Sequence, residues 1–463
     1  MRFYTRLSNG SIMIALGVIL TACVHMPSSK SNQASRLALP KRYDATQPPV
    51  PEVASGLLQV FPNARIRKYV DIALKQNPDL RASAARLEEA GFNTRRAFSA
   101  SVPSLTANGS GSRTRIAGSP NSVASPINNI FSTSLDVAWE VDVWGRIRAG
   151  VTASASDEAA AAADYAAARQ SIAAQTMQAY FTLIAEGKLL ALSQRRLNSF
   201  QKTYDLVNRR FEGGTGSLGD LDLSRTDVER TKAEVSQRKD TRDQAARQLR
   251  VITGSYPNAG ARAYNWPSLR RSVPAGIPSA VLMNRPDIDA AYQRIRAADS
   301  RVKVAHRDLY PSFNLTGSGG RQSSIFSDLL ESNFRTWTLA GGITAPILDG
   351  GNRRAELGAA NARAKEALAN YESIVLAAFQ EVENALGSEY YLKQQEISYK
   401  EALKAAKSAE ASVRRSYEGG TVEILTLLDT QRRAFDTEEL LINVQAQRYQ
   451  NRVSLALALG KGL

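Results

Sequence analysis

The sequence is poor in the side chains on which many enzymes and metal sites depend, since its 463 residues include one cysteine and two histidines. A single cysteine excludes an intramolecular disulfide. Because that residue, Cys23, is expected to carry a lipid, no His/Cys metal cluster or Cys–His catalytic pair is available. His306 lies in a predicted helix just before a strand, where a packing or helix-end role is the simpler interpretation. The glycine-rich run at 317–320 lacks the Lys-Ser/Thr pair of a phosphate-binding loop. We therefore predict that the protein is not an enzyme and has no metal site.

Long apolar runs are also missing beyond the N-terminus. No stretch of about 18 apolar residues occurs there, so helices that cross a membrane are not expected. The net charge of +15 would be compatible with a nucleic-acid partner. The basic residues, however, are interspersed with acids along predicted helices, as in residues 229–234. This pattern favours solvated helix faces, and we expect no nucleic-acid partner.

Proline is absent from two long segments, 127–256 and 347–463. Within them apolar and aromatic residues recur every seven positions, for example at Leu183, Leu190, Leu197, Tyr204 and Phe211. A sustained seven-residue repeat predicts helices that supercoil against their neighbours. These helices would be far longer than the average globular helix of about 11–12 residues. We predict long helical hairpins at 146–254 and 352–460.

The first 23 residues have the features of a bacterial lipoprotein signal. Arg2 and Arg6 precede a short apolar core at 12–20, and Leu-Thr-Ala-Cys ending at Cys23 matches a lipobox. A segment of this kind is removed from the mature chain. We predict a signal peptide at 1–22 and a covalent lipid on Cys23, with no other cofactor.

The residues that follow are predicted to form a tether. Residues 23–62 are rich in serine, proline and alanine and show little periodicity, which is typical of an extended segment. Val24, rather than aspartate, follows the lipidated cysteine. By analogy with known lipoproteins, that residue permits sorting to the outer membrane.

The rest of the chain contains the same turn and proline motifs twice. Pro78 and Pro103 recur as Pro286 and Pro311, with the same offset of 208 residues (286 − 78 and 311 − 103). An aromatic residue followed by Glu-Gly-Gly-Thr also occurs twice. Such repetition predicts a duplicated architecture. The predicted parts are a first repeat at 63–256, a linker at 257–279 and a second repeat at 280–463.

Each repeat is expected to open with a helix and to continue with a pair of strands, at 103–143 and 312–348. Apolar residues alternate there with small or polar ones, as around Trp139 and Trp337, which places them on one face. Each strand is long enough to cross a bilayer when tilted, which takes about 9–11 residues. An open sheet edge is not tolerated in lipid and small membrane barrels have about eight strands or more, so the chain must oligomerise if these strands span a membrane. Three copies would give a 12-stranded barrel. A soluble strand pair packed on helices explains the alternation equally well.

Each long hairpin is interrupted by a Gly-Gly-Thr segment, where glycine supplies the positive φ of a sharp reversal. Acidic residues follow both segments. Asp220 and Glu423 fall at predicted helix starts, where interaction with the helix dipole explains them without a functional role. Asp429 lies farther into its helix, so capping explains it less well.

Together these motifs resemble the TolC-like outer-membrane factors of tripartite efflux pumps, particularly their lipidated NodT/OprM-like branch. The resemblance covers nearly the whole mature chain. It rests on the lipobox, the repeated proline motifs, the segments 139–145 and 346–351, and the two hairpin tips. The order, spacing and duplication of these motifs make it specific.

The resemblance implies a mainly α fold with a four-strand transmembrane β contribution from each chain. Three chains would form a homotrimer, whose 12-stranded β-barrel spans the outer membrane and continues into a long periplasmic α-helical barrel. It implies a passive exit duct for efflux, lipid-anchored in the outer membrane and extending into the periplasm. The implied partners are a periplasmic adaptor protein, an inner-membrane RND-type pump and outer-membrane lipid. The connectors at 114–130 and 322–332 would face the exterior.

The resemblance also suggests residues for the gate that closes the duct and for docking of the adaptor. The gate candidates are acids near the tips, namely Asp220, Asp222, Glu423 and Asp429. The docking candidates are Gly213, Gly214, Thr215, Gly419, Gly420 and Thr421. One departure matters, because Thr426 and Val422 occupy the positions of a family acid and a gate arginine. The closed gate must then be tied differently, through Glu423 or the basic pair Arg414 and Arg415.

A competing hypothesis is a periplasmic, lipid-anchored coiled-coil scaffold or adaptor without a pore. Both hypotheses account for the long hairpins and the lipid. Only the duct requires four strands of bilayer length, whereas an adaptor usually carries a lipoyl-like β-domain and one hairpin.

Overall fold

The computed structural model describes residues 29–34, 56–115, 117, 127–263, 265–269, 284–460 and 462. The predicted signal peptide and Cys23 lie outside these residues, as do most of the predicted tether and part of the predicted linker. The chain divides into two compact units. We call them the sheet unit (1–36, 96–153 and 295–368) and the hairpin unit (37–95, 154–294 and 369–463).

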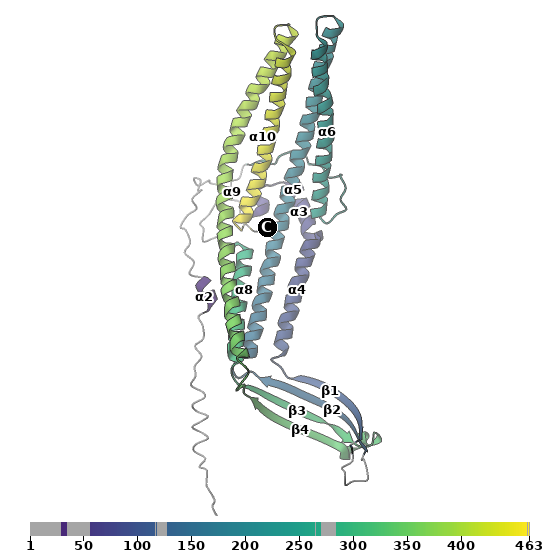
Figure 1. Ribbon diagram of the computed structural model, residues 1–463, viewed down its shortest axis with the longest axis vertical. Helices are drawn as coiled ribbons and strands as arrows, with labels where there is room; N and C mark the ends of the chain where they lie inside the picture. The colour runs from purple at the N-terminus through teal and green to yellow at the C-terminus, as the bar shows by residue number, and fades with distance from the viewer. Residues whose placement is uncertain are drawn as a thin grey trace, which may run out of the picture. The chain divides into compact units, whose positions relative to one another are not determined.

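The long helices come in pairs of equal length. The pairs are α4 (Pro78–Ser99) and α8 (Pro286–Arg307) with 22 residues each, α5 (Arg146–Glu212) and α9 (Asn352–Glu418) with 67 each, and α6 (Leu218–Ile252) and α10 (Ile424–Ala458) with 35 each. Figure 1 shows α5 with α6 and α9 with α10 as two antiparallel hairpins. Among the described residues, no helix combines the length and apolar character needed to cross a membrane.

The remaining helical elements are short. They are α2 (Lys30–Ala34), α3 (Ala64–Gln76) and the 3-10 turns η1 (Leu57–Gln59), η2 (Ser327–Leu330) and η3 (Ser332–Phe334).

The first repeat was expected to open with one helix, but it opens with two, α3 and α4, which are divided at Asn77. Pro78 has no amide hydrogen and suits the first position of a new helix, which explains the break. The side chain of Asn77 accepts a hydrogen bond from the amide of Leu80 at 3.0 Å and donates one to the carbonyl of Ile252 at 2.8 Å. The break therefore ties the start of α4 to the end of α6.

The sheet unit contains one antiparallel sheet in the order β1-β2-β3-β4 (Figure 1). Its strands are β1 (Ser104–Arg115), β2 (Ile127–Val141), β3 (Ser312–Ser323) and β4 (Arg335–Thr344). β2 begins at Ile127, within the segment expected to connect the first two strands, because residues 127–130 pair through their backbones with the end of β1. β4 ends at Thr344 rather than at Leu348, and Pro346 could not donate a ladder hydrogen bond.

Strand register divides this sheet into two chemically different faces. In one row across the sheet, Leu135 pairs with Ala107 and Gly319, and Gly319 pairs with Trp337. The next row toward the helices contains Leu105, Val137 and Leu339. We call this the apolar face, completed by Trp139, Leu315, Val141, Phe313 and Ile343. Trp337 and Leu339 are 82% and 78% exposed, so the face is uncovered within one chain.

The opposite face carries hydroxyl, amide and carboxyl groups. Asp136 accepts hydrogen bonds from Asn108 at 2.6 Å and from Ser134 at 2.7 Å. Ser110 and Ser132 are 2.8 Å apart on the same face. The alternation expected from the sequence therefore corresponds to one apolar and one polar sheet surface.

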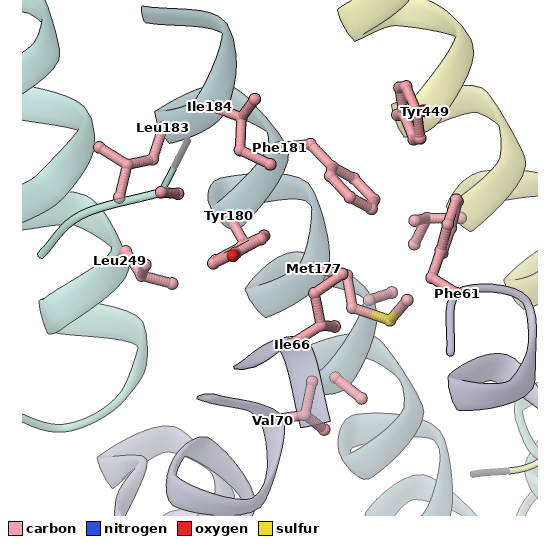
Figure 2. Close-up of a cluster of buried hydrophobic side chains, with 14 of the residues drawn as sticks. Phe61, Ile66, Val70, Met177, Tyr180, Phe181, Leu183, Ile184, Leu249 and Tyr449 are labelled. Atoms are coloured by element: carbon pink, nitrogen blue, oxygen red, sulfur yellow. The ribbon is translucent and has the colours of Figure 1, made fainter. Parts of the chain in front are cut away.

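The largest core lies in the hairpin unit and is built around Phe181 of α5 (Figure 2). Its ring centroid lies 4.8 Å from that of Phe61 and 5.1 Å from that of Tyr449 of α10. Tyr449 also stacks on Trp266, with centroids 4.5 Å apart and planes within 7°. The core thus joins the segment before α3, helices α5 and α10, and the residues that follow α6.

Two positive-φ glycines make a matched test of local structure. Gly254 has φ of 68°, and a Cβ there would lie 2.3 Å from the carbonyl oxygen of Gln76. Gly214 has φ of 71° with nothing within 4 Å. Gly214→Ala should lower the free energy of unfolding by about 1–2 kcal/mol, the cost of a left-handed conformation. Gly254→Ala should lower it further, because the end of α3 must move. Thermal unfolding followed by circular dichroism measures both changes. Equal losses of unfolding free energy in the two variants would contradict this prediction.

Candidate functional site

The two tips close by the same hydrogen bonds. In the first, the amides of Gly213 and Thr215 donate to the carbonyls of Arg209 at 3.0 Å and Arg210 at 2.9 Å. In the second, Gly419 and Thr421 donate to Arg415 at 3.0 Å and Ser416 at 2.9 Å. Each threonine hydroxyl donates to the same carbonyl as its amide. The six predicted docking residues are therefore ordered by backbone bonds, and all of them are exposed.

Only the second glycine of each pair has the left-handed conformation expected of both. Gly214 and Gly420 have φ of 71° and 76°. A Cβ on Gly213 would lie 3.3 Å from the Arg209 carbonyl oxygen, which is a tight contact. A Cβ on Gly419 would lie 3.5 Å from the Arg415 carbonyl oxygen, which is an ordinary van der Waals distance. Each tip thus exposes backbone that a partner can approach closely.

An apolar cluster lies behind the tips and brings the two hairpins together. It contains Phe200 and Val207 of α5, Val228 of α6, and Leu427 and Leu428 of α10, all at most 3% exposed. These residues belong to the heptad stripes of the sequence or adjoin them. Because the cluster buries one face of each of these helices, the charged side chains lie on the other faces.

Arg210 links the ends of α5 and α9. Its guanidinium lies 4.3 Å from the ring centroid of Tyr417 and donates to the Tyr417 carbonyl at 2.5 Å. Burial raises the pKa of the Tyr417 phenol, so this ring stays neutral near neutral pH. A cation above a neutral aromatic face is an attractive contact.

The four predicted gate acids occupy different environments. Asp220 is half-buried in the first turn of α6, where Ser217 accepts a hydrogen bond from its amide at 3.1 Å. Asp222 and Glu423 are exposed, and Glu423 precedes α10 without making a side-chain cap bond. Asp429 is exposed and pairs at 2.8 Å with Arg433 of its own helix. None of these contacts joins one hairpin to the other.

A carboxylate that does join the two hairpins was missed in the sequence. Asp227 of α6 is 2% exposed and accepts two hydrogen bonds from Arg432 of α10, with N–O distances of 2.6 Å and 3.3 Å. Arg230 lies 3.6 Å from the same carboxylate. Breaking a buried pair of this kind by removing one partner costs about 3–5 kcal/mol. One signal was present: Asp227 lies seven residues after Asp220 and beside Val228 of the heptad stripe.

Other polar contacts extend this junction along the helices. Gln431 is fully buried and donates to the hydroxyl of Thr203 of α5 at 3.0 Å. Arg414 of α9, one of the predicted basic pair, donates to Ser199 of α5 at 3.2 Å and to Glu410 at 2.8 Å. Arg414 therefore links α9 to α5 rather than pairing with a predicted gate acid.

A second layer of ion pairs follows farther from the tips. Arg196 of α5 lies 3.7 Å from Glu234 of α6 and 3.1 Å from Asp436 of α10. Glu438 of α10 pairs with Arg195 of α5 at 2.5 Å and with Lys407 of α9 at 2.8 Å. Burial alone would raise the pKa of Glu438, but hydrogen bonds from Lys407 and Arg195 outweigh it and hold that pKa below its ordinary value. All four long helices are thus connected by charged side chains.

In the described portion of the chain, no group of three or more His, Cys, Asp or Glu residues could hold a metal ion. The arrangement offers two exposed hairpin tips, an apolar cluster and a layer of ion pairs.

Comparison with known proteins gives a consistent result. The family model described as outer membrane efflux protein matches residues 69–255 and 277–461. The outer membrane protein OprJ of Pseudomonas aeruginosa is 31% identical over 409 residues, covering 86% of this chain and 85% of OprJ. The cation efflux system protein CusC of Escherichia coli K12 is 27% identical over 455 residues, covering 96% and 98%. The structure of the outer-membrane channel OprN matches with a TM-score of 0.87 and 26% identity, over 95% of this chain and 99% of that one.

Proposed function

This chain belongs to the outer membrane efflux protein family, and from that premise we propose that it is the outer-membrane exit duct of a tripartite efflux system. Members of this family are efflux channels rather than enzymes. The duct conducts passively, and a pump in the inner membrane supplies the energy. The observation that carries the proposal is the exposed apolar face of a sheet with two unpaired edges.

That face and those edges support the insertion of the sheet into a membrane together with further copies of the chain. A contiguous apolar surface of this kind is unfavourable in water, and open strand edges are unfavourable in lipid. Within one chain, β1 and β4 each have a neighbour on one side only. Three copies joined edge to edge would form a closed 12-stranded barrel with the apolar face toward lipid and the polar face toward the lumen. The equal helix pairs support a matching 12-helix barrel and a duplicated chain.

The hairpin tips are proposed as both the gate and the adaptor-docking surface. The pair of Asp227 and Arg432 ties the two hairpins of one chain, and the exposed acids Asp222, Glu423 and Asp429 would line the narrow end of a trimer. A ring of carboxylates there favours cations. The exposed tip glycines and threonines would receive a periplasmic adaptor protein, which in turn contacts an RND-type pump.

Anchoring through a lipid on Cys23 remains a proposal, since that residue lies outside the described part of the chain. A nearby contact supports a strap that lies against the folded body. Asp299 of α8 accepts hydrogen bonds from the Ser29 hydroxyl at 2.5 Å and from the amides of Lys30 and Ser31 at 2.8 Å each. Burial acts to raise the pKa of Asp299, but these hydrogen bonds outweigh it and hold the pKa below its ordinary value. The start of the tether is therefore held by a charged carboxylate.

Single-channel conductance of the purified mature protein in a planar bilayer, after sizing in detergent, tests the proposal. We expect a trimer with small, cation-selective resting currents. The tips carry acidic residues, and the pair of Asp227 and Arg432 holds the two hairpins of each chain together. A non-conducting, predominantly helical monomer would overturn the duct and favour the lipid-anchored scaffold without a pore.

A further inference from the structure

The apolar face of the sheet ends in a pair of arginines. Arg321 of β3 and Arg335 of β4 are direct cross-strand partners, two residues beyond the row of Gly319 and Trp337. Because side chains alternate along a strand, both arginines lie on the apolar face. Two like charges directly opposite each other are unfavourable in a sheet. An anion bound between them would remove that repulsion.

The turn that follows β3 folds back over this end of the apolar face. Arg321 donates to the carbonyls of Leu329 and Leu330, each at 3.0 Å. The ring of Phe326 meets that of Phe131 edge-on, with centroids 5.6 Å apart. The Arg321 guanidinium is therefore partly occupied in holding η2, whereas the side chain of Arg335 forms no hydrogen bond or ion pair with the residues that the structure describes.

A hollow of about 750 Å³ remains between η2 and the sheet. Ala107, Leu135 and Gly319 line it on the sheet side, and Phe326 and Leu330 line it on the turn side. Leu330 is 83% exposed and Phe326 is 71% exposed, so these side chains still offer apolar surface. A Cβ on Gly319 would meet nothing within 4 Å, which shows that the sheet side of the hollow is open.

We propose that this hollow binds a phosphorylated, multiply acylated glycolipid of the lipid A type from the outer leaflet. The apolar lining accepts acyl chain, and the two guanidinium groups accept phosphate, for which planar paired donors are well suited. The inference rests on the proposed function, which turns the apolar face toward lipid and the connectors toward the exterior.

The remaining charges near the hollow favour the same ligand. Register places Arg113 and Arg115 of β1 on the same face farther along the strand, where they add positive charge. Asp328 and Glu331 of the turn oppose them. Among the residues that line the hollow, two are arginines and none is acidic, so the lining is positive and matches a ligand that carries phosphate.

Binding of purified diphosphoryl lipid A to the detergent-solubilised protein, titrated by native mass spectrometry, tests the proposal. Arg335→Gln should weaken binding by about tenfold, the effect of one charge-assisted contact. Gly319→Val should weaken it comparably by filling the apolar side, and it leaves both arginines in place. Arg81→Gln, which removes an exposed charge from α4 of the hairpin unit, should bind like the wild type. The sized oligomer and thermal unfolding of each variant show whether the fold is kept.

Several outcomes would overturn the inference. They are equal lipid A binding by the wild type and both site variants, equal binding of phosphatidylglycerol, and full competition by millimolar inorganic phosphate. Conductance of the same preparations separates this inference from the proposed function. If the wild-type protein conducts but does not bind lipid A, only the proposed lipid site is contradicted. If it binds lipid A but does not conduct, only the proposed duct is contradicted.

Discussion

Asp227→Ala is expected to raise the resting conductance of the protein by about tenfold or more. The substitution removes the carboxylate that Arg432 holds across the two hairpins, at N–O distances of 2.6 Å and 3.3 Å. If these charge-assisted hydrogen bonds contribute about 1.5–3 kcal/mol to the closed arrangement, their loss shifts the closed–open equilibrium by at least tenfold. Single-channel recording and vancomycin sensitivity of cells that express the variant measure the shift.

The choice of partner matters for this experiment. Asp227 is buried, whereas the side chain of Arg432 is 32% exposed. Asp227→Ala therefore leaves a cation that water can reach, and the fold should survive. Arg432→Ala leaves a buried carboxylate with only Arg230 at 3.6 Å, so it should also lower thermal stability. The double variant should conduct like Asp227→Ala, since both remove the same contact.

Comparison variants come from an exposed acid of α6 and from two of the predicted gate acids. Glu229→Ala removes an exposed carboxylate from the same helix, one that pairs with Lys232 of that helix at 2.8 Å, and should change the resting conductance little. The combination of Asp220→Ala and Asp429→Ala should raise conductance less than Asp227→Ala, because Asp429 pairs only with Arg433 of its own helix. If that combination raises the conductance more than Asp227→Ala does, the gate is formed by the acids predicted from the sequence and not by Asp227.

Phe181→Ala is expected to cause the largest loss of stability in the hairpin unit. Its side chain is fully buried and its ring lies within 4.8–6.4 Å of four other aromatic rings, of which Figure 2 labels Phe61, Tyr180 and Tyr449. Removing a buried phenylalanine ring costs about 3–5 kcal/mol through lost transfer free energy and a residual cavity. The free energy of unfolding should fall by that amount, with a lower midpoint in thermal unfolding of the purified protein.

Phe92→Ala is the matched control, because Phe92 lies on α4 of the same unit and is 56% exposed. It should change the midpoint by little, since most of its surface already contacts solvent. Equal losses in the two variants would mean that the aromatic cluster does not stabilise this unit.

Much of the fold could be predicted from the sequence because it depends on local chemistry. Two proline-free segments with a seven-residue repeat predicted the long hairpins, and α5, α6, α9 and α10 lie within them. Alternation around Trp139 predicted the strands, whose apolar and polar faces follow from a period of two. The break at Asn77 was missed, although Pro78 marked it, because helical periodicity continues on both sides of the turn.

The candidate site could be predicted from the sequence less completely than the fold, because its contacts depend on the tertiary structure. The sequence determined where the tips lie and which acids follow them, since glycine and helix-start preferences are local. Only packing decided that Asp227, rather than Asp429, faces an arginine of the other hairpin, because periodicity gives a residue's helix face but not the neighbour opposite it. The hollow beside Arg335 likewise required the turn after β3 to fold back onto the sheet, and no local preference specifies that contact.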